Sequence, residues 1–147
     1  MNTYKSIFIS ILLVGLSTLA FSQDEGKTLV KSFNLQGNTS VELGLQGDVD
    51  VQRWNNSIMR IQMNIVLENG TSSMLKSLVQ VGRYNLKSVT KDGTYKVYAP
   101  GMDRDVRIKG KELIEAISYT VYLPNDVELK EAGTAAVQSN IEVTEIR

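Results

Sequence analysis

The sequence contains neither cysteine nor histidine, and these two absences exclude more chemistry than any residue present supplies. Without cysteine there can be no disulfide, no thiol nucleophile, no cysteine-ligated zinc and no lipid anchor attached through a thiol. Without histidine the chain lacks the usual general base near neutral pH and the commonest ligand of zinc and copper. A domain built from this chain must be held together by packing and by hydrogen bonds of its sheets.

An excess of charge of either sign is absent too, because 16 basic residues balance 16 acidic ones. This balance does not favour binding to nucleic acid or to an acidic membrane surface. Glycine-rich loops of the kinds that hold phosphate groups are missing as well. We therefore expect no nucleic-acid partner and no cofactor.

The first 22 residues have the pattern of an export signal. Lys5 precedes an apolar run from Ile7 to Leu19, and small residues follow at Ala20 and Ser22. The run is too short to span a bilayer comfortably, and no later segment is long enough to do so. We expect cleavage after Ser22, a single domain over residues 23–147, and a location in the periplasm, on the outer surface or outside the cell.

Alternation of apolar and polar residues dominates the rest of the chain and predicts strands with one buried face. In the first runs, apolar residues recur at odd positions: Val41, Leu43, Leu45, Val49, Val51, Met59, Ile61, Met63, Ile65 and Leu67. Between two of these runs, residues 55–57 have the Asn-rich composition of a tight turn. The pattern predicts a β-hairpin over about residues 48–68.

One short helix is predicted over residues 73–81, where apolar residues recur at helical spacing. Thr71 or Ser72 can cap its start, and Gly82 is placed to end it. Further strands are expected within residues 83–89, 94–99, 105–109, 116–123 and 126–130, and a last one at 141–146. Residues 109–116 are expected to form a strand pair, with one helical turn as the alternative. The expected fold class is mainly β with one short α-helix.

The stretches "GDVDVQRWNNSIMRIQMNI", "GRYNL", "TKDGTYKVYAP" and "ISYTVYLPNDVEL" resemble exported adhesin-type domains of Gram-negative bacteria. The resemblance covers about residues 41–130 and implies a β-solenoid-like stack of the adhesin-head type, with no assigned catalytic residues. Only 23 residues follow Pro124, however, whereas a solenoid needs about three or more stacked repeats. A compact two-layer sheet structure or a short β-solenoid is therefore expected.

Paired carboxylates are the first candidates for chemistry. Asp48 with Asp50, and Asp103 with Asp105, supply only a fraction of the six to eight oxygen ligands that calcium takes, so we expect no metal site. Glycosidases also use two carboxyl groups. The candidates for that role are Asp48, Asp50, Glu112 and Glu115, and their spacing does not select a pair.

The tyrosines divide by position along their strands. Tyr95 and Tyr119 share the parity of apolar neighbours and are expected in the core, whereas Tyr98 and Tyr122 are expected to face outward. Together with Arg53 and Trp54, the two outward tyrosines form a candidate binding surface for a glycan or a protein.

These observations predict a non-enzymatic, exported structural or adhesion module of the cell envelope, with an envelope protein or glycan as partner. It would act through exposed side chains or through an uncovered strand edge. A small carbohydrate-active hydrolase is the alternative, and it requires two carboxyl groups converging in a cleft, one of them with a raised pKa. An inhibitor or a chaperone-like domain would differ from the first prediction only in what it binds.

Overall fold

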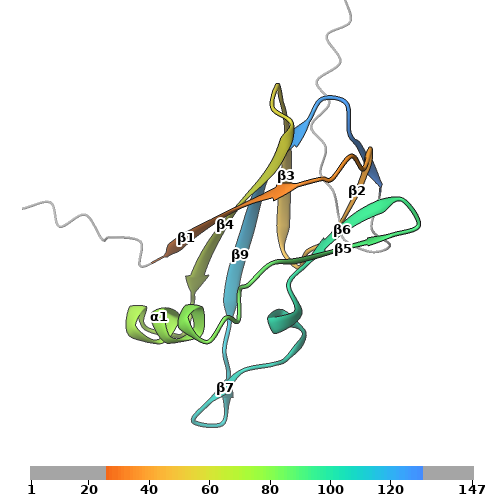
Figure 1. The fold of residues 1–147 in the computed structure, drawn as a ribbon. Coiled ribbons are helices and arrows are strands. Elements are labelled where there is room, and N and C mark those ends of the chain that lie inside the picture. The colour runs from red at the N-terminus through yellow and green to blue at the C-terminus, as the bar shows by residue number, and fades with distance from the viewer. Residues whose placement is uncertain (1–25, 131–147) are drawn as a thin grey trace, which may run out of the picture.

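Two four-stranded β-sheets make up most of the computed structural model, which describes residues 26–130 (Figure 1). The first sheet has the order β1 (Lys27–Asn34), β4 (Ile58–Leu67), β9 (Glu115–Pro124) and β3 (Asp48–Trp54). The second has the order β10 (Glu128–Lys130), β2 (Ser40–Gly44), β6 (Thr94–Tyr98) and β5 (Lys87–Lys91). These two sheets, together with the one α-helix of the described residues, confirm the predicted mainly β fold class. The predicted export signal and the predicted strand at 141–146 lie outside the described residues.

The core lies between the two sheets and is built by the alternating residues. In β4 the inward side chains of Met59, Ile61, Met63 and Ile65 are at most 1% exposed. Val41 and Val97 of the second sheet belong to the same cluster. Tyr95 and Tyr119 are buried as predicted. Val49 and Val51 are only partly buried, because β3 lies at the edge of its sheet.

The predicted hairpin of residues 48–68 is wrong in its pairing, although both of its strands exist. β3 and β4 do not pair with each other, because β9 lies between them, parallel to β3 and antiparallel to β4. Residues 55–57 therefore cross the end of β9, where Pro124 is the register partner of Trp54. Turn composition predicts that a chain reverses, but it does not determine which strand becomes the neighbour.

The two-layer structure shares two features with a solenoid: parallel strand pairs, and a chain that passes directly from one sheet to the other. β2 is parallel to both β6 and β10, and β3 is parallel to β9. The chain passes directly from β2 in the second sheet to β3 in the first through residues 45–47. Gly47 has a φ of +125° at this crossing.

The helix α1 (Ser72–Gln80) confirms the prediction to within one residue at each end. The Oγ1 atom of Thr71 accepts a hydrogen bond from the backbone N–H of Met74. Gly82, with a φ of +80°, ends the helix, and the N–H of Arg83 donates to the carbonyl of Leu78 over 3.1 Å. The buried side chain of Leu75 packs the helix against the core.

The remaining short elements gather at one end of the sheets. Residues 83–86, predicted as strand, form a linker instead, and the 3₁₀ turn η1 (Pro100–Asp103) follows β6. β7 (Arg107–Ile108) and β8 (Lys111–Glu112) pair as a short hairpin, so strands are present within the predicted ranges 105–109 and 109–116 but are only two residues long there, before β9 begins at Glu115. Figure 1 shows α1, η1 and β7 around the end where β9 begins.

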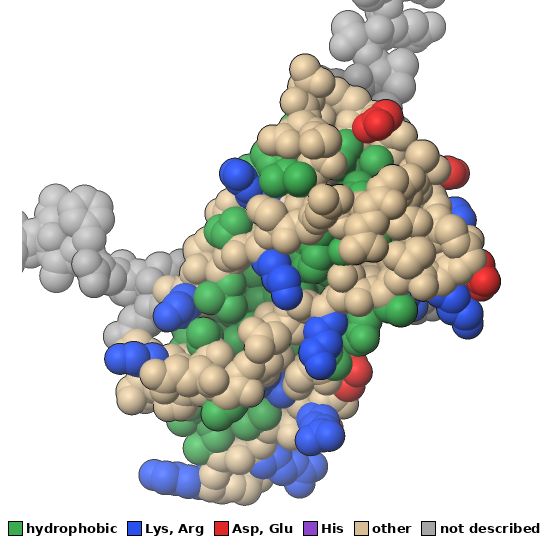
Figure 2. Space-filling model, in the orientation of Figure 1, with side chains coloured by type: hydrophobic (Ala, Val, Ile, Leu, Met, Phe, Trp, Pro, Cys, Tyr) green, Lys and Arg blue, Asp and Glu red, His purple; other side chains and the backbone are tan. Residues whose placement is uncertain are grey.

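The surface between β1 and β5 combines hydrophobic and basic side chains. Figure 2 shows hydrophobic side chains in a broken band along this side, with Lys and Arg distributed over the same face and few acids. Among residues 26–130, no helix has the length and apolar character needed to cross a membrane.

Candidate functional site

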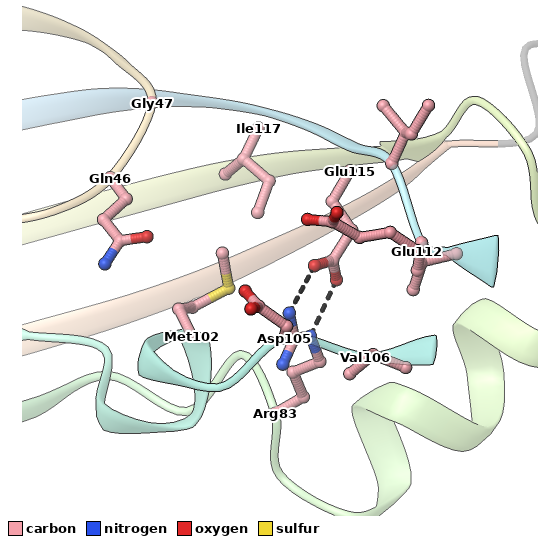
Figure 3. Close-up of a pocket in the computed structure, with 11 residues that line it drawn as sticks. Gln46, Gly47, Arg83, Met102, Asp105, Val106, Glu112, Glu115 and Ile117 are labelled. Atoms are coloured by element: carbon pink, nitrogen blue, oxygen red, sulfur yellow. Dashed lines mark hydrogen bonds and ion pairs between the residues drawn. The ribbon is translucent and has the colours of Figure 1, made fainter. Parts of the chain in front are cut away.

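A pocket of about 370 Å³ opens at the end of the sheets where β9 begins (Figure 3). It is shaped by the turn between β2 and β3, by η1, by the β7–β8 hairpin and by the first residues of β9. Its polar and apolar walls are formed in part by Gln46, Met102, Asp105, Glu112, Glu115 and Ile117. Arg83 also lines it, so the pocket includes the one ion pair between buried side chains among the described residues.

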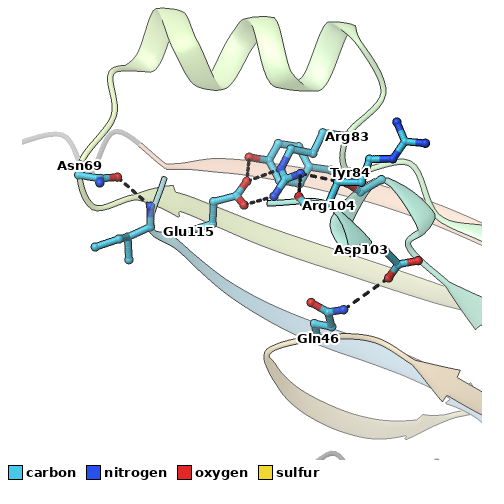
Figure 4. Close-up of polar contacts among 9 residues, drawn as sticks. Gln46, Asn69, Arg83, Tyr84, Asp103, Arg104 and Glu115 are labelled. Atoms are coloured by element: carbon cyan, nitrogen blue, oxygen red, sulfur yellow. Dashed lines mark hydrogen bonds and ion pairs between the residues drawn. The ribbon is translucent and has the colours of Figure 1, made fainter. Parts of the chain in front are cut away.

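Arg83 and Glu115 form this pair, and each side chain is only 8% exposed. The Nε of Arg83 donates to one oxygen of the Glu115 carboxylate over 2.8 Å, and Nη2 donates to the other over 2.5 Å. This two-pronged geometry is the strongest that an arginine makes with a carboxylate. It fixes the linker after α1 to the start of β9 (Figure 4).

Further hydrogen bonds satisfy the other polar atoms of the pair. Nη1 of Arg83 donates to the carbonyls of Gly101 over 3.0 Å and Arg104 over 2.8 Å. The hydroxyl of Tyr84 donates to Glu115 over 2.5 Å. The network formed by Arg83, Tyr84 and Glu115 therefore joins the helix linker, η1 and β9, three segments that have no strand pairing with one another.

The electrostatics of the network follow from its burial and its bonds. Burial by itself disfavours the charged form of Glu115, but the hydrogen bonds from Arg83 and Tyr84 and the charge of Arg83 outweigh it, so its pKa is lowered. Burial, followed by the bond to Glu115, raises the pKa of Tyr84. The bond to Glu115 raises the pKa of Arg83 against the effect of burial. All three groups are thus held in their ordinary ionisation states near neutral pH.

The four candidate carboxylates of the alternative hydrolase lie in two separate places. Asp48 and Asp50 are exposed on β3, where Asp50 accepts a hydrogen bond from Gln52. Glu112 and Glu115 line the pocket, together with Asp105. Glu115 is held ionised, so it does not provide the protonated acid that the hydrolase mechanism requires. Within residues 26–130, no three Asp or Glu side chains are grouped so that they could hold a metal ion.

Only two of the four predicted binding residues lie together. The rings of Trp54 and Tyr122 are 5.3 Å apart between centroids, on the outer face of the first sheet. Arg53 instead donates hydrogen bonds to the carbonyls of Pro124 and Val127 and so fixes the segment after β9. Tyr98 belongs to β6, in the second sheet. The predicted four-residue surface is therefore not formed as one patch.

Arg60, and not the predicted Arg53, is the basic residue that lies beside the aromatic rings. Its guanidinium carbon lies 5.1 Å from the centroid of the Trp54 ring, within the range of a cation–π contact. Arg60 pairs in register with Tyr122 across β4 and β9. Its outward parity was visible in the sequence, but its proximity to Trp54 depends on strand β9, which lies about sixty residues further along the chain.

Amide and hydroxyl side chains extend this surface along the sheet. The register places Gln52, Tyr122, Arg60 and Ser32 in one row across the four strands, and Asp50, Thr120, Gln62 and Val30 in the next. A third row contains Asp48, Ser118, Asn64 and Thr28, in which Thr28 donates to Asn64 over 2.8 Å. We call these rows, with Trp54, the outer face of the first sheet.

Tyr119 has a buried hydroxyl group with no hydrogen-bond partner among the described residues. Burial, with a smaller effect from the charge of Glu115, raises its pKa to about 12. We expect Tyr119→Phe to raise the free energy of unfolding by about 1 kcal/mol, because it removes an unsatisfied polar group and leaves the ring in place. Urea denaturation at neutral pH measures this change.

The same substitution is expected to alter the stability in alkali. In the unfolded chain Tyr119 loses its proton near pH 10, whereas in the folded chain it keeps it to about pH 12. The free energy of unfolding of the wild type therefore falls as pH rises above 10, and part of that fall is absent in Tyr119→Phe. Equal alkaline slopes in the two proteins would contradict this assignment.

Among solved structures, the chain is similar to a "putative cell adhesion protein" from Clostridium sporogenes ATCC 15579, with a TM-score of 0.40 and 13% identity over 72% of this chain and 45% of that one. It is also similar to a "putative adhesin" from Bacteroides fragilis NCTC 9343, with a TM-score of 0.37 and 14% identity over 73% of this chain and 41% of that one. The chain thus spans less than half the length of either structure. No protein-family model and no curated protein matches it.

Proposed function

We propose that this chain is a non-enzymatic, exported recognition module that binds a glycan on the outer face of its first sheet. The observation that carries the proposal is the contact of Trp54 with both Tyr122 and Arg60. Trp, Tyr and Arg are the residue types most enriched at the energetic hot spots of protein–protein interfaces. Their packing against one another reduces the rotational freedom that binding would otherwise remove.

The chemistry of the face fits a sugar better than an apolar ligand. A sugar ring has an apolar C–H face and a rim of hydroxyl groups, and an aromatic ring covers the first while amides and hydroxyls bond the second. Trp54 and Tyr122 supply the aromatic rings, and the neighbouring rows supply Gln52, Gln62 and Thr120. These groups lie on a rigid sheet, which keeps their spacing constant between the free and the bound protein.

The polar network in the pocket supports a role without catalysis. Its ion pair uses both carboxylate oxygens of Glu115 and the donors of Arg83 for internal bonds, which fix three segments of the chain. A catalytic acid or base instead needs a pKa close to the working pH and a proton that substrate can reach. The network is accordingly interpreted as structural.

Replacing Trp54 by alanine is expected to weaken glycan binding by at least about tenfold, because it removes the ring that both Tyr122 and Arg60 contact. Screening the mature chain on a glycan array, followed by calorimetry with the best glycan, measures this effect. The Nε1 of Trp54 also donates to the carbonyl of Ile58, so Arg60→Met serves as a second variant that leaves this bond intact.

Tyr98→Ala is the matched control, since Tyr98 lies in the second sheet and is expected to leave glycan binding unchanged. The proposal fails if neither the array nor isolated envelope fractions contain a saturable glycan partner. It also fails if Tyr98→Ala weakens binding as much as Trp54→Ala does.

A further inference from the structure

Acidic residues are absent from the two segments that form one side of the molecule. Residues 26–41 and 69–91 contain no Asp or Glu, but they contain Lys27, Lys31, Lys76, Lys87 and Lys91, besides Arg83, whose charge is paired with Glu115 in the pocket. These segments form β1, α1, the linker after it and β5. The topology makes β1 and β5 the last strands of their sheets, so the separation of charge in the sequence becomes a basic side of the sandwich.

The two edge strands lie close to each other on this side. The rings of Phe33 and Tyr95 meet edge to face with centroids 6.3 Å apart, which joins β1 to the second sheet. The ammonium group of Lys31 donates to the carbonyl of Leu86 over 2.6 Å, just before β5 begins. Lys31 therefore already has a hydrogen-bond partner. Because its charge points inward at the edge strand β1, it hinders the addition of another strand there.

The groove between β1 and the linker is mainly apolar. It has a volume of about 220 Å³ and is lined by Leu29, Val30, Val79 and Leu86, among others. Among residues 26–130, four large hydrophobic side chains are exposed, and three of them lie on elements of this side: Val30 at 59%, Val81 at 79% and Val89 at 47%. The basic side of the molecule, seen in Figure 2, therefore also has apolar surface that is exposed to water.

β5 differs from β1 in being open. All five of its residues are exposed, and among the described residues only β6 pairs with it. Lys87 and Lys91 share a face with Val89 between them, as their register with Tyr98, Lys96 and Thr94 shows. An unpaired edge strand offers a row of backbone donors and acceptors to another extended chain.

We infer that the free edge of β5 binds an extended, acidic segment of another protein, which adds to the second sheet as a further strand. Acidic side chains at alternate positions of that segment would face Lys87 and Lys91, and an apolar side chain between them would cover Val89. A second copy of β5 is disfavoured in this place, because its own lysines would meet lysines of the same charge. This site is independent of the glycan surface, which lies on the other sheet.

The test uses a synthetic peptide with Glu, Val and Glu at alternate positions, separated by threonines and blocked at both ends. Titrated into the isotopically labelled mature chain, it is expected to shift backbone amide signals of β5 and β6 and to leave those around Trp54 unchanged. A peptide with Lys in place of both Glu residues is expected to bind about tenfold more weakly.

The charge-swapped variant K87E/K91E is expected to reverse this preference. K27E/K76E is the matched control, since it changes the net charge by the same amount on β1 and α1 and should keep the preference of the wild type. Because Lys87 and Lys91 are exposed, the swap is expected to keep the fold, which the amide spectrum itself shows. The inference is overturned if the acidic peptide shifts no amide signal of β5, or if both variants show the same preference between the two peptides. It is also overturned if dextran sulfate displaces the peptide and binds more tightly while shifting the same amide signals.

Discussion

Glu115→Ala is expected to lower the free energy of unfolding by about 3–5 kcal/mol, as measured by urea denaturation. Removing one partner of a buried ion pair leaves the other charge uncompensated in a medium of low polarity. Here the charge left behind is the guanidinium of Arg83, whose side chain is 8% exposed. The hydroxyl of Tyr84 loses its acceptor in the same step. The expected loss is a large part of the stability of a small domain.

Glu112→Ala is the control for this substitution, because it removes a carboxylate from the wall of the same pocket. Glu112 is exposed, and its expected effect is within about 0.5 kcal/mol. Arg83→Met is expected to cost as much as Glu115→Ala, since it also leaves the carbonyls of Gly101 and Arg104 without their donor. If Glu115→Ala costs no more than Glu112→Ala, the network does not hold the pocket together.

The pH dependence of the same variants gives a second measure of the network. The folded chain keeps Glu115 ionised to a lower pH than the unfolded chain does, because its pKa lies below the ordinary value of 4.5. As pH falls below that value, the unfolded chain takes up the proton first, which favours unfolding. The contribution of Glu115 is thus fully present above about pH 4.5 and is lost as pH falls through the folded pKa. Glu115→Gln is expected to show a weaker acid slope than the wild type.

The sequence predicted the strands well because their physical signal is local. One buried face requires an apolar residue at every second position, and β4 shows this requirement from Met59 to Ile65 without exception. Pairing is not local in the same way. β9 lies between β3 and β4, although about fifty residues separate it from β4 along the chain, and no turn signal at residues 55–57 reports that insertion.

The buried ion pair could not be predicted from the sequence, because it too depends on contacts between distant segments of the chain. The sequence pattern indicates Glu115 only as a candidate for a catalytic carboxylate pair, and it places Arg83 within a predicted strand. Their contact depends on the end of α1 and the start of β9 meeting in space. The local hint was that each charged residue stands among apolar ones, in "VGRYNL" and "LIEAI". The outer face of the first sheet was predicted in part, since the parity of Trp54 and Tyr122 is a local property and the choice of Arg60 over Arg53 is not.

Gly47→Ala is expected to lower the free energy of unfolding by roughly 3 kcal/mol or more. Gly47 has a φ of +125°, a conformation that a residue with a side chain adopts only with strain. A Cβ atom at this position would also lie 2.4 Å from the carbonyl oxygen of Ile117, which belongs to the backbone of β9. Because that oxygen cannot move without shifting a central strand, the clash is expected to displace the crossing from β2 to β3.

Gly37→Ala is the control for backbone strain at a positive φ without a clash. Gly37 also has a positive φ, of +80°, but nothing lies within 4 Å of a Cβ atom built there, so the substitution introduces backbone strain of about 1–2 kcal/mol and no clash. The loss in Gly47→Ala beyond that in Gly37→Ala, measured by urea denaturation, then reports the clash of residue 47 with β9 together with the greater backbone strain at φ +125°. Equal losses would mean that the crossing can shift away from Ile117. In that case the parallel pairing of β3 with β9 would tolerate a wider connection than the structure has.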